Sequence, residues 1–226
     1  MSTTTLNPIT NDVQPDQPGA VTATEPVVVL KRRSIDAVLI GFGVVAMVAF
    51  LIAGLLLTWG YRFSDDYVSN ELSSQNITFP TAEALEGQGR DDLVKFADNR
   101  LDTGAEAEAY ASYIDGHLEG IADGATYAEL GTPETAAKDA VTAAIDAGSP
   151  QAEIDELQAT ADQVSAQRNS LFKGETLRGL LLSAYAWSTV GTIAGIAAIG
   201  AFLAAGVMAV LVALGVVHHR RTPKTA

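Results

Sequence analysis

Two long stretches of the chain contain no charged residue, and polar, mostly acidic sequence separates them. The first stretch covers residues 37–59 and the second covers residues 179–217. A helix needs about 20 apolar residues to cross the hydrocarbon core of a bilayer, and both stretches reach that length. The pattern therefore predicts an all-α membrane protein in which two transmembrane helices flank an extracytoplasmic helical bundle.

The second stretch is longer than one span requires. Its 39 residues would measure about 58 Å as a helix, against about 30 Å for the hydrocarbon core. Aromatic residues favour membrane interfaces, so we expect Tyr185 and Trp187 to mark the boundary of the second span. Trp59 and Tyr61 are the corresponding anchors of the first span. We predict a juxtamembrane helical stalk at 178–189 and transmembrane helices at 37–59 and 190–217, with a re-entrant segment before the second span as the alternative.

Small residues recur along the second span and predict a helix-packing face. Close approach of backbones drives helix association in lipid, and small side chains permit it. The partner of this face is the first span, a second copy of the chain or another membrane protein. The predicted packing residues are Gly191, Gly195, Ala197, Ala201, Ala205, Ala209 and Ala213.

Basic residues flank the two ends that a two-span protein places on the same side of the membrane. Cytoplasmic flanks carry an excess of Lys and Arg, so both termini are predicted to be cytoplasmic in a multi-pass protein of the cell membrane. The flanks at the opposite ends are less basic. The flanks next to the two termini carry six basic residues: Lys31, Arg32, Arg33, Arg220, Arg221 and Lys224. Those at the opposite ends carry four: Arg62, Arg168, Lys173 and Arg178.

The middle segment, residues 64–177, shows helical periodicity and turn signals. Thr103 and Glu106 form a capping-box pattern that opens a helix to about Ala122. Thr132 followed by Pro133 predicts the N-cap of a second helix, which runs to about Ala147. Positions three and four apart after Pro150 predict a third helix packed on its neighbours. The apolar-face positions of that helix are Ile154, Leu157, Ala161, Val164, Arg168 and Leu171.

Charge restricts the partners of the middle segment. Residues 64–177 contain 23 Asp and Glu against 6 Lys and Arg. Such an acidic domain repels nucleic acid, and its partners are basic protein surfaces or divalent cations. The segment 1–30 has no apolar periodicity and is predicted to be a disordered cytoplasmic tail, and residues 218–226 form a basic cytoplasmic tail.

Catalytic chemistry has little support. The chain has no cysteine, so disulfides and thiolate metal sites are excluded. His117 is the one histidine of the middle segment, and we expect it to be a partly buried structural residue. Non-haem iron sites use two histidines and a carboxylate, which this segment does not supply. We predict neither a cofactor nor a catalytic residue, and neither span holds an ionisable residue for an ion path.

Several runs resemble small two-span membrane proteins of actinobacteria. They are residues 77–80, 109–118, 127–129 and, most specifically, 171–187 beside the second span. The resemblance implies the same two-span arrangement and supplies no catalytic residues. Similar sequences are sometimes labelled aromatic-ring-opening dioxygenases, but the middle segment lacks the two histidines that a non-haem iron site uses.

These observations predict a non-enzymatic integral membrane protein. It would act as an accessory or scaffold subunit that engages a membrane or envelope partner through its outer helices and its small-residue transmembrane face. The partners are the lipid bilayer and another membrane protein or a second copy. The alternatives are a metal-dependent enzyme, which predicts a role for His117, and a ligand sensor in the outer domain.

Overall fold

The computed structural model of the chain describes residues 32–221. The predicted disordered tail, 1–30, and the last five residues of the predicted basic tail, 218–226, lie outside the described residues. Within them the chain folds into helices α1 to α5 and two short 3-10 helices, η1 and η2.

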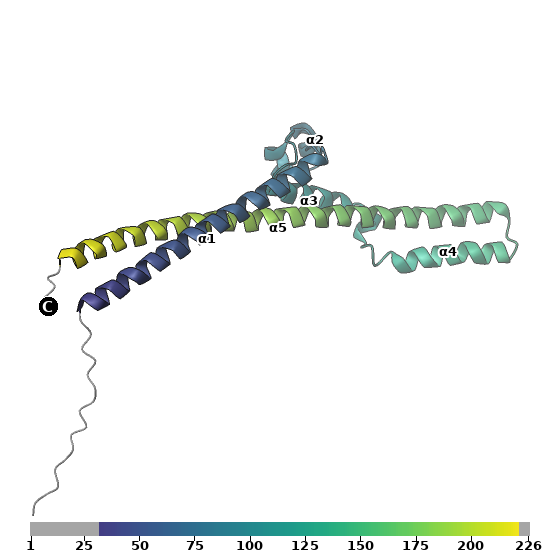
Figure 1. Ribbon diagram of the computed structural model, residues 1–226. Helices are drawn as coiled ribbons and strands as arrows, with labels where there is room; N and C mark the ends of the chain where they lie inside the picture. The colour runs from purple at the N-terminus through teal and green to yellow at the C-terminus, as the bar shows by residue number, and fades with distance from the viewer. Residues whose placement is uncertain (1–31, 222–226) are drawn as a thin grey trace, which may run out of the picture.

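Two long helices form the axis of the molecule. α1 spans Arg32–Ser74 and α5 spans Gln151–Arg221. The helices run antiparallel and side by side, so the described ends of the chain lie together (Figure 1). With 71 residues, α5 is about 106 Å long at 1.5 Å per residue. The predicted third helix, the stalk and the second span are therefore one unbroken helix, which contains no turn for a re-entrant segment.

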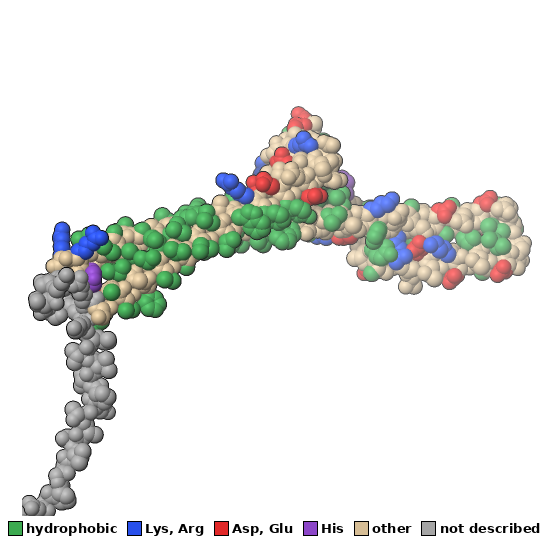
Figure 2. Space-filling model, in the orientation of Figure 1, with side chains coloured by type: hydrophobic (Ala, Val, Ile, Leu, Met, Phe, Trp, Pro, Cys, Tyr) green, Lys and Arg blue, Asp and Glu red, His purple; other side chains and the backbone are tan. Residues whose placement is uncertain are grey.

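Both long helices are apolar and exposed over a length that can cross a membrane. Their most apolar 18-residue windows are only 11% and 17% buried inside the protein. The core helix of a water-soluble domain would be mostly buried instead. Hydrophobic side chains cover this part of the pair, which we call the shaft: residues 37–59 of α1 and the facing part of α5, about 196–218 (Figure 2). The prediction of two helices long and apolar enough to span a membrane is confirmed.

A small lobe, residues 75–119, packs on the end of α1 and the middle of α5. It contains α2 (Ala82–Gly87), η1 (Asp91–Phe96) and α3 (Gly104–Glu119). Leu85 and Leu101 are fully buried in its core, which also takes in Val68 of α1 and Leu181 of α5. The lobe therefore fastens the two long helices to each other.

Local signals set the ends of α3. The capping box at Thr103 is confirmed: its side chain accepts from the backbone of Glu106, whose carboxylate accepts from the backbone of Thr103. The predicted end at Ala122 is wrong, because α3 stops at Glu119. Ala122 and Asp123 take left-handed backbone angles in the turn that follows, with φ of 51° and 55°, which a continuing right-handed helix excludes.

The remaining helices form a distal hairpin, residues 131–173. After η2 (Ala122–Gly124), α4 (Gly131–Asp146) packs antiparallel on the first part of α5 (Figure 1). The predicted N-cap at Thr132 is wrong, since α4 begins at Gly131 and its N-cap is Leu130. The predicted apolar face of α5 is confirmed, because Ala161 and Leu171 are buried and the other four positions are half-buried.

The fold class is confirmed as all-helical with two long apolar helices. The bundle arrangement predicted for the helices between them is not confirmed. They lie at two places along α5, with one buried cluster in the lobe and a second one around Leu118, Leu130 and Leu171. α5 is long enough to carry both groups, and they meet at the second cluster, to which Leu118 of α3 belongs.

Candidate functional site

Glycines line the contact between α1 and α5. A Cβ atom on Gly54 would lie 2.8 Å from the ring of Phe202, and one on Gly43 would lie 2.7 Å from Val212 Cγ2. The side chain of one helix thus seats on a glycine of the other, which brings the backbones close. The same arrangement joins Gly191 to Ser64, Gly195 to Tyr61 and Gly215 to Ile40.

The contact repeats every seven residues on α5. Gly191, Ala198 and Ala205 are buried at this spacing. Positions spaced 3.5 residues apart on average stay on one face of two helices that wind around each other with a left-handed twist. Positions spaced four apart advance by about 40° per step at 3.6 residues per turn. The predicted alanine row therefore crosses the contact at an angle.

Only some of the predicted packing residues therefore lie in the contact between α1 and α5. Gly191 and Ala205 are buried against α1, while Gly195 and Ala201 are half-buried beside it. Ala197, Ala209 and Ala213 are exposed on the surface of the helix pair. These three side chains leave a small-residue surface that α1 does not cover.

Ser64 is a contact residue that the sequence did not single out. It is 2% exposed, and its hydroxyl donates a hydrogen bond of 2.5 Å to the backbone carbonyl of Trp187. The small side chain of Ser64 lets α1 approach Gly191 of α5 closely, and its hydroxyl is hydrogen-bonded although it is buried. The signal available in the sequence, a lone serine between aromatic and acidic residues, is too common to be informative.

The predicted interfacial anchors lie at two heights along the helix pair. Tyr61 covers Gly195, so Trp59 lies level with about Ile196. Trp187 faces Ser64 and is therefore about nine residues, or roughly 13 Å, farther along the axis than Trp59. Tyr185 lies beside the lobe, with its backbone close to Gly104. The four residues thus do not form a single belt around the shaft.

An apolar groove opens between α1 and α5 next to the shaft, and we call it the juxtamembrane groove. It encloses about 290 Å³. Tyr67 and Trp187 stand at the end nearer the shaft, whereas Gln75 and Leu177 stand at the other end. The remaining lining residues are Val68, Glu71, Leu72, Ile77, Leu180, Leu181, Ser183 and Ala184.

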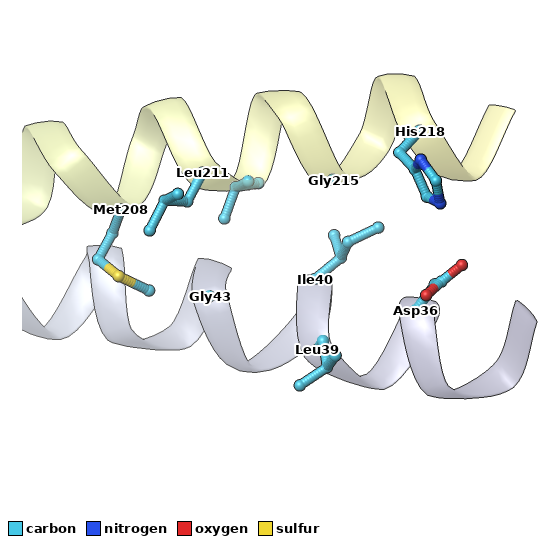
Figure 3. A pocket seen from close by; sticks show the side chains of 9 residues that line it. Asp36, Leu39, Ile40, Gly43, Met208, Leu211, Gly215 and His218 are labelled. Atoms are coloured by element: carbon cyan, nitrogen blue, oxygen red, sulfur yellow. The ribbon is translucent and has the colours of Figure 1, made fainter. Parts of the chain in front are cut away.

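A second cleft lies at the opposite end of the shaft. It encloses about 280 Å³ between α1 and α5 and is walled by Ile40, Met208 and Leu211. Asp36 and His218 point toward each other across its mouth (Figure 3). These two residues come from opposite ends of the chain, and only the antiparallel pairing brings them together.

A charged network fixes the distal hairpin. The carboxylate of Glu134 on α4 accepts hydrogen bonds from Lys138 at 2.7 Å, from Arg168 of α5 at 2.6 Å and from Ser165 at 2.8 Å. The Arg168 guanidinium also lies over the ring of Tyr127, 4.1 Å from its centroid. The hydrogen bonds from Lys138, Arg168 and Ser165, in that order, lower the pKa of Glu134 to about 2.

This network predicts that acid loosens the hairpin. The folded pKa of about 2 lies below the ordinary value of 4.5, so the stabilisation is complete above pH 4.5 and is lost as the pH falls toward 2. Spin labels on cysteines at the exposed positions Ala136 and Ala166 should separate over this range in the native sequence. The Glu134→Gln variant should be looser at pH 7 and change less between pH 4.5 and 2. The Glu153→Gln variant is the control, and an equal response in both variants would contradict the prediction.

His117 is not the partly buried residue that the sequence predicted. It is exposed on α3, and its ring packs on Tyr113 with 4.4 Å between centroids. Its Nδ1 lies 2.9 Å from the Tyr113 carbonyl oxygen. Among the described residues, no three His, Asp or Glu side chains converge as a metal-binding group.

Comparison with protein-family models, with curated proteins and with solved structures finds no match to this chain. The resemblance to two-span proteins of actinobacteria therefore stays a prediction. The features of the molecule that bear on function are the helix pair, the juxtamembrane groove and the distal hairpin.

Proposed function

We propose that this chain is a non-enzymatic scaffold of the cell membrane, with the shaft in the bilayer and both termini in the cytoplasm. One observation carries the proposal: α5 runs unbroken from the shaft to the tip of the distal hairpin. Its segment 151–195 is about 67 Å long, so it holds the tip at a fixed distance outside the membrane. A rigid helix of this kind suits a protein that positions a binding surface.

The tip of the hairpin has the chemistry of a docking surface for a basic protein. Between Lys138 and Arg168 the chain carries six acidic residues and no Lys or Arg. All six are exposed, and opposite charge on a partner steers association and fixes its orientation. They are Asp139, Asp146, Glu153, Asp155, Glu156 and Asp162.

The membrane-embedded part offers a second contact surface. Ala197, Ala209 and Ala213 remain exposed after α1 and α5 have paired. In lipid, such small side chains allow another helix to approach closely. A neighbouring membrane protein or a second copy of the chain can therefore pack on α5 without displacing α1.

The proposal predicts capture of a partner at the tip from outside the cell. The chain lacks cysteine, so Ala159→Cys provides a single thiol for a membrane-impermeant photo-crosslinker. We expect labelling of this cysteine in intact cells, and of Arg221→Cys only after the membrane is opened. Crosslinking through position 159 should give one discrete adduct. Neutralising Asp146, Glu153, Asp155 and Glu156 should reduce its yield about tenfold.

The matched control neutralises four exposed carboxylates elsewhere, namely Asp65, Asp66, Glu83 and Glu86, and should leave the adduct intact. If position 159 reacts only in opened cells, the orientation is wrong. If it reacts in intact cells but yields only uncrosslinked monomer, the scaffold function is wrong.

A further inference from the structure

The apolar surface of the helix pair does not stop at the end of the shaft. Trp59, Phe63 and Tyr67 stack in succession along one side of α1, with centroid separations of 5.6 Å and 6.2 Å. Their exposed fractions are 67%, 52% and 48%. On α5, Val190 and Trp187 are also exposed. This apolar strip leads from the shaft to the open end of the juxtamembrane groove.

The lining of the groove is mostly apolar. Leu180, Leu181 and Ala184 of α5 face Val68 and Leu72 of α1, and the lining contains no Lys or Arg. Glu71, Gln75 and Ser183 are its polar members other than the Tyr67 hydroxyl and the Trp187 indole. Apolar pockets with a few polar groups are the usual form of a small-molecule site. An apolar ligand fits this lining.

The shape of the groove and its continuity with the shaft point to the kind of occupant. From Tyr67 to Gln75 the groove follows α1 for about 12 Å, and its volume is about 290 Å³. The apolar strip joins it to the part of the helix pair that is long and apolar enough to cross a membrane. A polymethylene chain from the membrane matches both the elongated shape and the mostly apolar lining.

We propose that the juxtamembrane groove holds one acyl chain of a phospholipid from the adjoining leaflet. The chain leaves the bilayer along the strip from Trp59 to Tyr67 and lies between α1 and α5 above the headgroups. The Glu71 carboxylate, midway along a lining without a cation, disfavours the carboxylate of a free fatty acid as the occupant. The inference rests on the proposed membrane placement of the shaft.

The two tryptophans of the chain, Trp59 and Trp187, make the proposal testable by fluorescence. Full-length protein is placed in nanodiscs of phosphatidylcholine brominated along its acyl chains, since bromine quenches tryptophan on contact. Trp187→Phe reports Trp59 alone, and Trp59→Phe reports Trp187 alone. We expect at least a twofold quenching of both, although Trp187 lies roughly 13 Å beyond Trp59 along the pair.

A variant with a filled groove distinguishes two causes of Trp187 quenching, namely an acyl chain in the groove and a bilayer that reaches Trp187 from outside. In the Trp59→Phe background, Ser183→Phe places a ring in the groove and should remove the quenching of Trp187. Thr189→Phe adds the same ring to an exposed α5 position outside the groove lining and should leave the quenching in place. Circular dichroism confirms that each variant keeps its helices.

Three outcomes overturn the inference. If Trp59 is quenched and Trp187 is not, the groove holds no acyl chain. The oligomeric state of the same sample then shows whether a second copy of the chain occupies the groove instead. Quenching of Trp187 that survives Ser183→Phe shows that the bilayer itself covers the site. If neither tryptophan is quenched, the membrane placement of the shaft fails, and the proposed function fails with it.

Discussion

Replacing Gly191 by leucine should force α1 and α5 apart. A Cβ atom at this position would lie 2.8 Å from Ser64 Cβ and 3.6 Å from the carbonyl oxygen of Tyr61. The clash is with the Ser64 Cβ atom, which the backbone of α1 holds in place, so rotation of a side chain does not make room and the whole helix has to move. Overpacking of this kind costs about 1–3 kcal/mol. The displacement also breaks the hydrogen bond from Ser64 to Trp187.

The measurement is the separation of α1 from α5 in detergent or nanodiscs. Spin labels on cysteines at the exposed positions Phe42 and Leu211 should move apart and give a broader distance distribution in Gly191→Leu. Gly200→Leu is the matched control, because a Cβ there meets nothing within 4 Å. Both substitutions replace a helical glycine by a better helix former. Equal distance distributions in the two variants would refute glycine packing at this contact.

Truncating Leu101 to alanine should unfold the lobe at much lower denaturant concentration. Leu101 has no exposed surface and lies in a cluster with Leu85, Phe79 and Val68. Removing a buried leucine in this way costs about 2–5 kcal/mol, because the lost contacts leave a cavity. Because the lobe is small, this cost is a large part of its free energy of unfolding.

Hydrogen exchange resolves this effect from the rest of the molecule. Amides of α3 and η1 should lose protection in Leu101→Ala, and the end of α1 should follow, because Val68 and Leu72 belong to the same core. The part of the distal hairpin beyond the shared contact of Leu118 with Leu171 should keep its protection. Ile145→Ala removes a side chain that is 56% exposed and serves as the control. If hydrogen exchange in the lobe is unchanged in Leu101→Ala, the lobe and the two long helices do not share one core.

Local patterns in the sequence predicted the parts of the fold that depend on neighbouring residues. The capping box at Thr103 and the apolar face from Ile154 to Leu171 were recovered because the interacting residues are close in the chain. The end of α3 at Glu119 was missed. It depends on a turn with two left-handed residues, Ala122 and Asp123, that periodicity does not reveal.

The packing face was predicted only in part. A row with a period of four is a plausible contact surface on an isolated helix, and it includes the buried Ala205. The observed contact instead repeats every seven residues, because α5 winds around a partner helix. The buried Ala198 and Ser64 could be found only after the register of α1 against α5 was known.

The sequence alone determined that the chain is helical, that two segments can span a membrane and that the intervening part is acidic. These properties follow from composition and from spacing along one helix. The tertiary structure decided the rest: the continuity of α5, the positions of the lobe and the hairpin along it, the meeting of Asp36 with His218, and the juxtamembrane groove. The reason is that each depends on the relative position of α1 and α5, which many distant contacts set together and no local pattern encodes.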